Sequence, residues 1–321
     1  MGFSFRPLRT IAALLLCVAA LTAAALAQDS RTHPYQGITY IDRTDSVPRA
    51  VHMHLVQIDL AAPGIRFKLS PHAGPREVVR QTTLDFLNTE HAQVAINAHY
   101  FWPWPSTDPE SSVLGIGASD GDVYSAFEIP EQSYALLPHA PGINVDATNH
   151  ASVVHFDPTF ADGKHIREPA TLWTTLAGSA QIVTDGAVTI PLYADGDHPE
   201  DRLAPGGPNN AYSNANSWYD AINARTSIGL SRDSRTVTLF TVDIRGGSQG
   251  MRVREVAETL VRDYGVWSAL NLDGGGSTSM AMEDPVTHAA SLINASSDNP
   301  AGRAVGSSLA VFARPNPRPH D

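Results

Sequence analysis

The chain has 321 residues and a formal net charge of −11, and 42% of its residues are hydrophobic. This length is sufficient for a sizeable core, in one large domain or two small ones. So acidic a chain disfavours nucleic acid as a partner, because a phosphate backbone is bound by basic surfaces. A small phosphate-bearing ligand stays compatible with it, since local arginines can gather at one pocket.

The first 27 residues have the pattern of a secretory signal peptide. Arg6 and Arg9 precede an apolar run over 11–25, and Ala25-Leu26-Ala27 fits a small-residue cleavage site. A single membrane anchor is the competing interpretation, but the run is shorter than the about 20 residues that a span needs. We therefore expect a secreted or periplasmic protein with no membrane span after cleavage.

The only cysteine of the chain, Cys17, lies inside this segment. A lipoprotein is excluded because Leu16, rather than a small residue, precedes it. Removing the segment would take away Arg6 and Arg9 and no acidic group, so the net charge would become −13. The mature protein would have neither a disulfide nor a thiolate, and its stability would depend on a large core.

Along the rest of the chain, strand patterns are more frequent than helix patterns. Apolar or alternating runs predict strands at 51–60, 64–70, 92–97, 225–231, 236–243, 267–273 and 307–313. Helical spacing predicts helices at 76–92 and 251–264. The first two strands are expected to form a hairpin across Pro63-Gly64, and the strands at 225–231 and 236–243 another. Asp-Gly turns predict further hairpins at 120–121 and 185–186.

These elements alternate in no regular βα order, and residues 195–223 form a long stretch rich in Gly, Pro, Asn and Asp. Loops of that length are uncommon unless they are functional or disordered. We expect an α+β fold, with helices covering a mixed, largely antiparallel sheet in a single large domain. Its expected parts are a lead-in segment at 28–48, a catalytic domain at 49–315 and a tail at 316–321.

The segment "SALNLDGGGSTSM" is the most informative candidate site. Asp273 ends an apolar strand and is followed by Gly274-Gly275-Gly276 and then by Ser277 and Thr278. Successive glycine amides can form an anion-binding nest, and glycine lets a phosphate or sugar approach the backbone. The alternative is a tight turn with a capping aspartate. A phosphate loop of the Walker type is excluded because no Gly-Lys-Ser/Thr follows.

A second aspartate, Asp243, also ends a strand, so the two carboxylates could divide acid and base roles. Alternatively, Asp243 only caps its turn. Arg225 and Arg245 each lie beside a strand end, and an arginine fork matches phosphate oxygens, although most arginines are surface charges. Asn97 could bond a sugar hydroxyl. Tyr100, Phe101, Trp102 and Trp104 could stack on a sugar ring, or could form an ordinary hydrophobic cluster.

Two further patterns have competing explanations. His52 and His54 share one side of a strand and could be a metal pair, but without a third ligand in view we interpret them as exposed strand residues. "GGSQG" at 246–250 matches a nucleophile elbow around Ser248, followed in order by Asp273 and His288. Only 24 residues separate Ser248 from Asp273, whereas the acid of an α/β-hydrolase follows a later strand, so a serine hydrolase is the weaker hypothesis.

Together the motifs resemble those of the phosphodiester glycosidase family. The similar blocks are "AINAHYF", "RTSIGL", "VDIRGGSQGMRVREVAETL" and "LNLDGGGSTSM", with "GRAVGSSLAVFA" as the closing strand. The resemblance implies a pocket that contains Asn97, Arg225, Thr226, Asp243, Arg245, Asn271, Asp273, Gly275, Ser277 and Thr278. Arg303 resembles an arginine before the family's last strand. His99 and Ile244 stand where the family commonly has small residues or glycine, so substrate preference could differ.

The resemblance implies hydrolysis of a sugar-1-phosphodiester, such as an N-acetylglucosamine-1-phosphodiester, at the anomeric C–O bond. Asp273 or Asp243 would be nucleophile or base, the arginines would neutralise the phosphate, and the substrate would be a cell-envelope or extracellular glycan. No cofactor is certain, and a divalent cation, Ca²⁺ or Mg²⁺, could lie between the aspartates. The alternative from another class is a glycan-binding protein without turnover, which the two aspartates at opposite ends of the sheet would favour.

Overall fold

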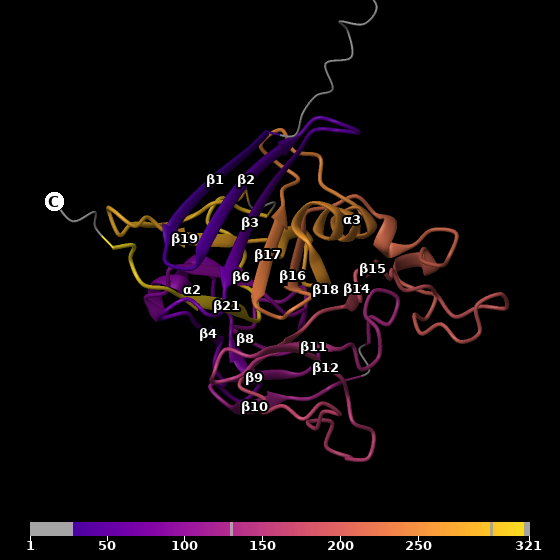
Figure 1. Ribbon diagram of the computed structural model, residues 1–321. Helices are drawn as coiled ribbons and strands as arrows, with labels where there is room; N and C mark the ends of the chain where they lie inside the picture. Colours follow the sequence, from indigo (N-terminus) through magenta and orange to yellow (C-terminus); the bar gives the residue numbers. More distant parts are fainter. Residues whose placement is uncertain (1–27, 129–130, 296–297, 318–321) are drawn as a thin grey trace, which may run out of the picture.

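A computed structural model describes residues 28–128, 131–295 and 298–317 (Figure 1). The expected signal peptide and the last four residues of the expected tail lie outside the described residues. No helix in the described part of the chain is long and apolar enough to cross a membrane.

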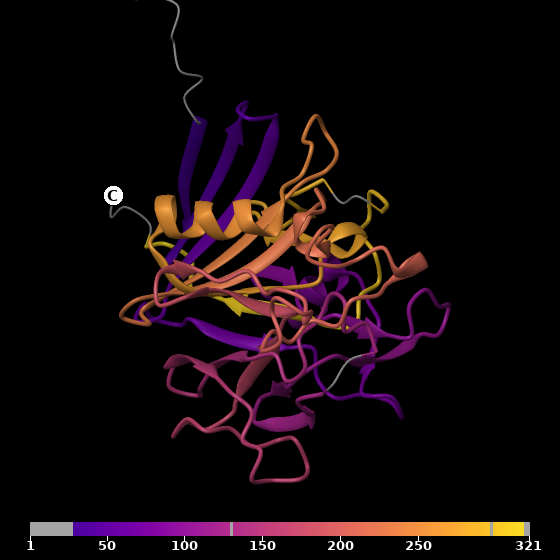
Figure 2. The ribbon, with the colours of Figure 1, turned by 90° about the vertical axis from the view of Figure 1, so that its right-hand side faces the viewer.

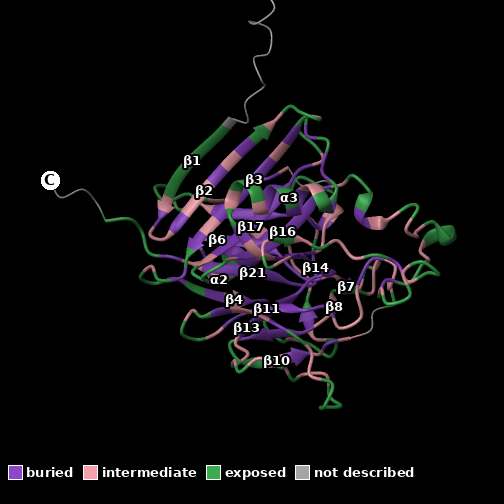
Figure 3. Cartoon of the chain, turned by 45° about the vertical axis from the view of Figure 1, so that its right-hand side comes forward, coloured by how far each residue is buried: buried purple, intermediate pink, exposed green. Residues whose placement is uncertain are grey.

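The largest element is an eight-stranded sheet with the order β1-β2-β3-β17-β16-β18-β14-β15. Its strands are β1 (Gln28–Tyr35), β2 (Ile38–Asp45), β3 (Val51–Asp59), β14 (Ala180–Thr184), β15 (Ala187–Val188), β16 (Arg225–Ser231), β17 (Thr236–Val242) and β18 (Val266–Asn271). Each neighbouring pair is antiparallel. Figure 3 shows that the central strands are largely buried, whereas β1 at the edge is exposed.

Two five-stranded sheets and a small three-stranded sheet complete the β structure. One five-stranded sheet has the order β20-β19-β6-β21-β4, from β4 (Arg66–Leu69), β6 (Val94–Asn97), β19 (Met280–Glu283), β20 (Ala290–Leu292) and β21 (Ser308–Phe312). The other has the order β10-β9-β13-β11-β12, from β9 (Gly117–Ser119), β10 (Asp122–Ser125), β11 (Gly142–Val145), β12 (Ala151–Val154) and β13 (Thr174–Ala177). The small sheet contains β5 (Val78–Val79), β7 (Phe101–Trp102) and β8 (Glu110–Val113).

The main core lies where the three large sheets meet. Ile58 and Leu270 from the eight-stranded sheet pack in one cluster with Ile96 and Leu309 from the sheet of β6 and β21, and with Leu176 of β13. The opposite face of the eight-stranded sheet is covered by α3 (Val253–Tyr264), as Figure 2 shows. The stretch 195–223 contains only the short 3₁₀ turns η1 (Pro208–Asn210) and η2 (Trp218–Asp220). A third such turn, η3 (Gly275–Ser277), lies in the glycine block.

The α+β class expected from the sequence is wrong, because the described chain is mostly antiparallel sheet and has only two α-helices, α3 and α2 (Thr83–Glu90). The helix expected at 76–92 starts late, since Val78 and Val79 pair with β8 and Thr82 caps the helix by accepting from the Asp85 amide. The sheets are antiparallel rather than mixed, and although α3 and α2 each pack on one of them, the sheets mainly cover one another.

The local hairpins are confirmed at β9–β10, β14–β15 and β16–β17. At the two Asp-Gly turns the central residues have positive φ, for example 50° at Asp120 and 84° at Gly121. The expected hairpin across Pro63-Gly64 is wrong, because β3 pairs with β2 and β17 whereas β4 pairs with β21. The chain crosses between two sheets at that turn, and Gly64 has a φ of +85° there.

Candidate active site

Asp273 lies two residues after the end of β18, beside the start of β16. The Leu272 amide donates to the Thr226 carbonyl at 2.9 Å, and the Gly275 amide donates to the Ala224 carbonyl at 2.9 Å. The antiparallel pairing of β16 with β18 thus brings together segments that are far apart in sequence. It holds the glycine block against the strand that carries Arg225.

The carboxyl group of Asp273 is half-buried, and its surroundings favour a proton. Burial raises the pKa of Asp273 to about 7, although hydrogen bonding from Ser277, the positive charge of Arg303 and the Gly274 amide act in the opposite direction. A carboxyl group with a pKa near neutrality is suited to proton transfer and is a common feature of catalytic sites.

Glycine is needed after Asp273 because neighbouring groups come very close. A Cβ atom on Gly276 would lie 2.1 Å from Nη2 of Arg303, and one on Gly274 would lie 2.9 Å from the Ala224 carbonyl oxygen. Gly275 has a φ of +59°, which an L-residue rarely adopts. The glycines therefore let an arginine and a neighbouring strand pack directly against the block.

The amides of this block point mainly into the protein. Those of Asp273, Gly275, Ser277 and Thr278 donate to the carbonyls of Ala98, Ala224, Gly274 and Gly275. The Gly274 amide interacts with the Asp273 carboxyl group. These four amides of the block are therefore occupied by protein carbonyl groups.

Arg225 is buried, with 2% of its surface exposed. Its Nε donates to the Met251 carbonyl at 3.2 Å, its Nη2 donates to the Ala221 carbonyl, and its guanidinium lies 4.9 Å from the ring centre of Trp218. Among the described residues no carboxylate forms an ion pair with it. Burial lowers its pKa, and an uncompensated buried cation is costly, so an anionic ligand would stabilise it.

Arg303 forms a second cationic group at the glycine block. Its Nη1 donates to Ser277 Oγ at 3.2 Å, its Nε donates to Asp298 at 2.7 Å, and its guanidinium lies 4.0 Å from the ring centre of Trp104. Arg245 is exposed and lies close enough to help Arg303 lower the pKa of Asp298. The two arginines therefore flank one carboxylate at the rim of the site.

Asn97, Thr226 and Thr278 are all brought together, but as a buried network. Thr226 Oγ1 donates to Asn97 Oδ1 at 2.9 Å and to Thr278 Oγ1 at 3.3 Å, and the Ser279 amide donates to Asn97 Oδ1 at 3.0 Å. Asn97 Nδ2 donates to the Asp273 backbone carbonyl at 2.6 Å. All three side chains are fully buried, and Asn97 links this network to Asp273.

Asn271 links the same strand to an aromatic wall. Its Nδ2 donates to Ser179 Oγ at 2.9 Å and to the Tyr100 hydroxyl at 3.2 Å. Burial and then the charge of Asp273 raise the pKa of Tyr100, which therefore lies beside the site as a neutral phenol. The Tyr100 ring lies 6.2 Å from that of Trp218.

Asp243 lies at the same end of the eight-stranded sheet, with only β16 between β17 and β18. Leu272 packs in the core between the sheets, and the chain leaves β18 at this point, because the Asp273 amide donates to the Ala98 carbonyl at 3.0 Å. Asp243 lies beside His54, with Oδ2 at 3.3 Å from Nε2. Its oxygens also accept from Asn294 Nδ2 at 3.1 Å and from the Ala295 amide at 3.0 Å. The two carboxylates therefore belong to different clusters.

The family model for phosphodiester glycosidases matches residues 90–312, which is more than half of the chain. The chain belongs to the phosphodiester glycosidase family. It is therefore a glycosidase, a hydrolase whose substrate is a sugar or glycan. This confirms the family resemblance inferred from the strand-end motifs. No curated protein gives a significant match.

Solved structures share the fold of this glycosidase at low sequence identity. The catalytic domain of zebrafish N-acetylglucosamine-1-phosphodiester alpha-N-acetylglucosaminidase, auto-inhibited by its pro-peptide, is similar with a TM-score of 0.55 and 20% identity over 92% of this chain and 91% of that one. A hypothetical protein from Synechocystis gives 0.56 and 15% over 90% and 68%. A Burkholderia pseudomallei protein, provisionally described as exported, gives 0.54 and 18% over 82% and 74%.

The serine-hydrolase constellation is not assembled in this glycosidase. Ser248 Oγ donates to the Asp243 carbonyl at 2.6 Å and accepts from the His52 amide at 3.0 Å, so its hydroxyl stabilises its own turn. His288 instead lies beside Glu283 at 3.2 Å. The sequence order Ser-Asp-His therefore does not correspond to a proton relay.

His99 has a structural environment. It is fully buried, its Nδ1 lies 2.9 Å from Ser307 Oγ, and its Nε2 lies 3.0 Å from both the Ile116 carbonyl and the Ala177 amide. Burial lowers the pKa of His99 to about 4, so the imidazole is neutral and joins three segments of the chain.

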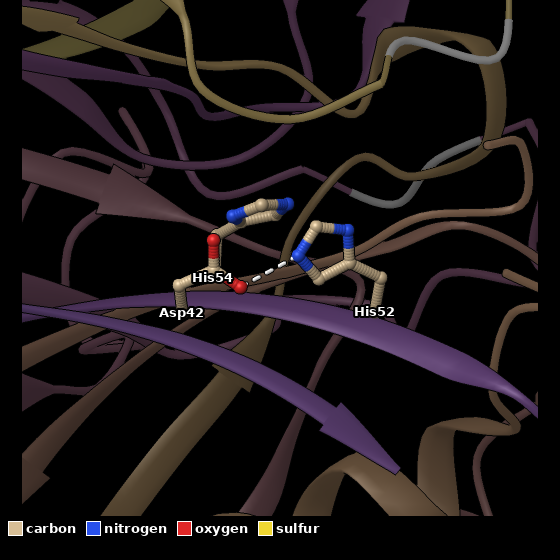
Figure 4. A group of neighbouring side chains, drawn as sticks. All are labelled: Asp42, His52 and His54. Carbon is tan, nitrogen blue, oxygen red and sulfur yellow. Dashed lines mark hydrogen bonds and ion pairs between the residues drawn. The ribbon is translucent and has the colours of Figure 1, made fainter. Parts of the chain in front are cut away.

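The histidine pair was only partly predicted. His52 and His54 share one side of β3 as expected, with ring centres 4.2 Å apart, but His54 is buried rather than exposed. The missing third group is Asp42 on β2, and together these three side chains could hold a metal ion (Figure 4). Asp42 carried no signal because only strand pairing brings it opposite His54. Trp218, which contacts Arg225, was also not singled out from the sequence. Its position in the long loop that precedes Arg225 could have indicated it.

Proposed function

We propose that this glycosidase hydrolyses a sugar-1-phosphodiester at the bond between the anomeric carbon and the phosphate oxygen, and that Asp273 is the reacting carboxylate. The observation that carries the proposal is the environment of Asp273. Its half-buried carboxyl group has a pKa of about 7 and lies on the glycine block that packs against Arg303 and the Arg225 strand.

The reaction breaks the C1–O bond, and the bonding electrons leave on the phosphate oxygen as a phosphomonoester. Water supplies the oxygen that binds C1, either directly or after Asp273 has bonded to C1, and its proton passes to Asp273. A phosphate monoester is a weakly basic leaving group, so strong acid assistance is less necessary than for an ordinary glycoside. In both routes Asp273 reacts in its ionised form.

The cationic and aromatic side chains support binding of the two halves of such a substrate. Arg225 and Arg303 supply positive charge for the phosphate, with Arg245 at the rim. Tyr100, Trp104 and Trp218 line the same region and suit a sugar ring. The zebrafish structure of similar fold is named for N-acetylglucosamine-1-phosphodiesters, which makes N-acetylglucosamine the first sugar to test.

We further propose that the protein is exported and acts on cell-envelope or extracellular glycans. The motivation is the expected signal at 1–27, and the similar Burkholderia protein described as exported points the same way. Expression of the full gene product followed by N-terminal sequencing should give a chain that starts at Gln28. An intact Met1 in the purified native protein would contradict export through this signal.

The decisive test of the reaction uses an N-acetylglucosamine-1-phosphodiester in water enriched in heavy oxygen. We expect free sugar that carries the label at C1 and an unlabelled phosphomonoester. Label in the phosphate would show P–O cleavage and contradict the proposal. Tight binding of the substrate with no product would instead support the glycan-binding alternative.

A further inference from the structure

Asp42, His52 and His54 form a compact cluster on the neighbouring strands β2 and β3. The register of β2 and β3 pairs Asp42 directly with His54. His52 lies two residues before His54, on the same side of β3. One ligand atom from each of the three lies within 4.8 Å of the others. Figure 4 shows both imidazoles and the carboxylate directed toward one another. We propose that these side chains bind a divalent transition metal of the zinc class.

The position of His54 is fixed by its neighbours on both ring nitrogens. Nδ1 lies 2.9 Å from the Tyr40 hydroxyl, and Nε2 lies 3.3 Å from Asp243 Oδ2. Metal-binding histidines usually use one nitrogen for the ion and the other for such an orienting hydrogen bond. A separation near 3.3 Å is also about that of two ligands on one tetrahedral ion with bonds of about 2.0–2.1 Å. Asp243 is therefore placed to complete or to orient the site.

The carboxylates of Asp42 and Asp243 favour a bound cation. Asp42 forms an ion pair only with His52, and Asp243 only with His52 and His54, within the part of the chain that the structure describes. Among the described residues, neither carboxylate of the cluster has a lysine or arginine partner. A divalent ion would neutralise both, and it could lie between His52 Nε2 and Asp42 Oδ1, which are 2.7 Å apart in its absence.

The ligand types select the class of ion. Two imidazoles and one carboxylate suit zinc and similar transition metals, whereas Ca²⁺ and Mg²⁺ prefer all-oxygen sites. The site therefore differs in position and in chemistry from a calcium or magnesium ion held between Asp243 and Asp273.

An entry path exists beside His52. Its side chain is 32% exposed. It lines a cavity of about 410 Å³ together with Ala50, Gly246, Gly247 and Ser248. An ion can therefore reach the cluster from solvent, and three protein ligands would leave one coordination position directed toward this cavity or taken by Asp243.

The test is a titration of the metal-free, untagged protein with Zn²⁺ by calorimetry and with Co²⁺ by visible absorption. We expect one ion per chain, a tetrahedral Co²⁺ spectrum, and no displacement by excess Mg²⁺ or Ca²⁺. Tyr40→Phe, which removes only the orienting hydroxyl, should weaken Zn²⁺ binding by about 10–100-fold. His52→Ala and Asp42→Asn should weaken it at least as much.

The matched control is His155→Ala, which removes an exposed imidazole paired with Glu168 at 2.7 Å outside the cluster. This variant should bind Zn²⁺ like the unaltered protein. Circular dichroism verifies folding. His52 and Tyr40 are partly exposed, and their substitution leaves the backbone hydrogen bonds between β2 and β3 in place. Absence of Zn²⁺ binding by the unaltered protein, or unchanged affinity in both His52→Ala and Asp42→Asn, would overturn the proposal.

Discussion

Asp273 and Asp243 make an instructive pair, because each aspartate lies within two residues of a strand end, at the same end of the eight-stranded sheet. Asp243 is almost fully buried, accepts from Asn294 and from the Ala295 amide, and lies against His54. Asp273 is half-buried beside Arg303, and its carboxyl group has a pKa near 7. Similar positions at strand ends therefore give two carboxylates with different neighbours and different exposure. The surroundings decide the role.

The largest expected difference between the two sites is in turnover. Asp273→Asn should lower kcat by about 10²–10⁴-fold, because it removes the reacting carboxylate while keeping its shape. Asp243→Asn should keep turnover within a few-fold in the folded fraction, since that carboxylate is engaged by His54, Asn294 and the Ala295 amide. Steady-state kinetics on an N-acetylglucosamine-1-phosphodiester would measure both. Equal losses in the two variants would break the distinction.

The second expected difference concerns stability. Asp273 has a pKa of about 7 in the folded protein against an ordinary value of 3.8, so between these pH values only the folded state retains the proton. The contribution of this group to stability therefore falls as pH rises through that window. The free energy of unfolding of Asp273→Asn should equal that of the unaltered protein below about pH 4. Above about pH 7 it should be higher by up to about 4 kcal/mol.

Urea unfolding at several pH values would measure this gain. The same experiment on Asp243→Asn should show a loss of stability, because it disturbs the buried contacts to His54 and the Ala295 amide. A stability difference for Asp273→Asn that is independent of pH would contradict the raised pKa.

A smaller effect is expected from the cation beside Asp273. The charge of Arg303 lowers the pKa of Asp273, so Arg303→Met should move the rise in kcat/KM to higher pH. Asp298→Asn removes the other partner of Arg303 and keeps the cation, and it serves as the control. Superimposable pH profiles for Arg303→Met and the unaltered protein would show that Arg303 does not act on Asp273.

The features that the sequence predicted correctly are local. Asp120-Gly121 carries its own turn chemistry, and the hairpin it predicts is present. The block around Asp273 was recognisable because a strand, an acid and three glycines are contiguous. The hairpin at Pro63-Gly64 failed because the choice of partner strand depends on distant residues, and β4 joins β21.

The same distinction applies within the site. Arg303 lies close to Asp273 and stacks on Trp104, whereas Trp218 contacts Arg225. These residues come from separate segments, and no spacing in the sequence predicts their contacts. Asn97 was found, but its full burial and its role in positioning Asp273 follow only from packing. The raised pKa of Asp273 likewise results from burial by residues far away in the chain.

The most direct test of the account is the pH dependence of kcat/KM for the unaltered protein, which reports ionisations of the free enzyme. We predict a rise of about tenfold per pH unit up to a plateau above about pH 7, because Asp273 reacts in its ionised form. The residual activity of Asp273→Asn should lack this ionisation. A profile that is flat through neutrality, or that falls as Asp273 ionises, would contradict the assignment of Asp273 as the reacting carboxylate.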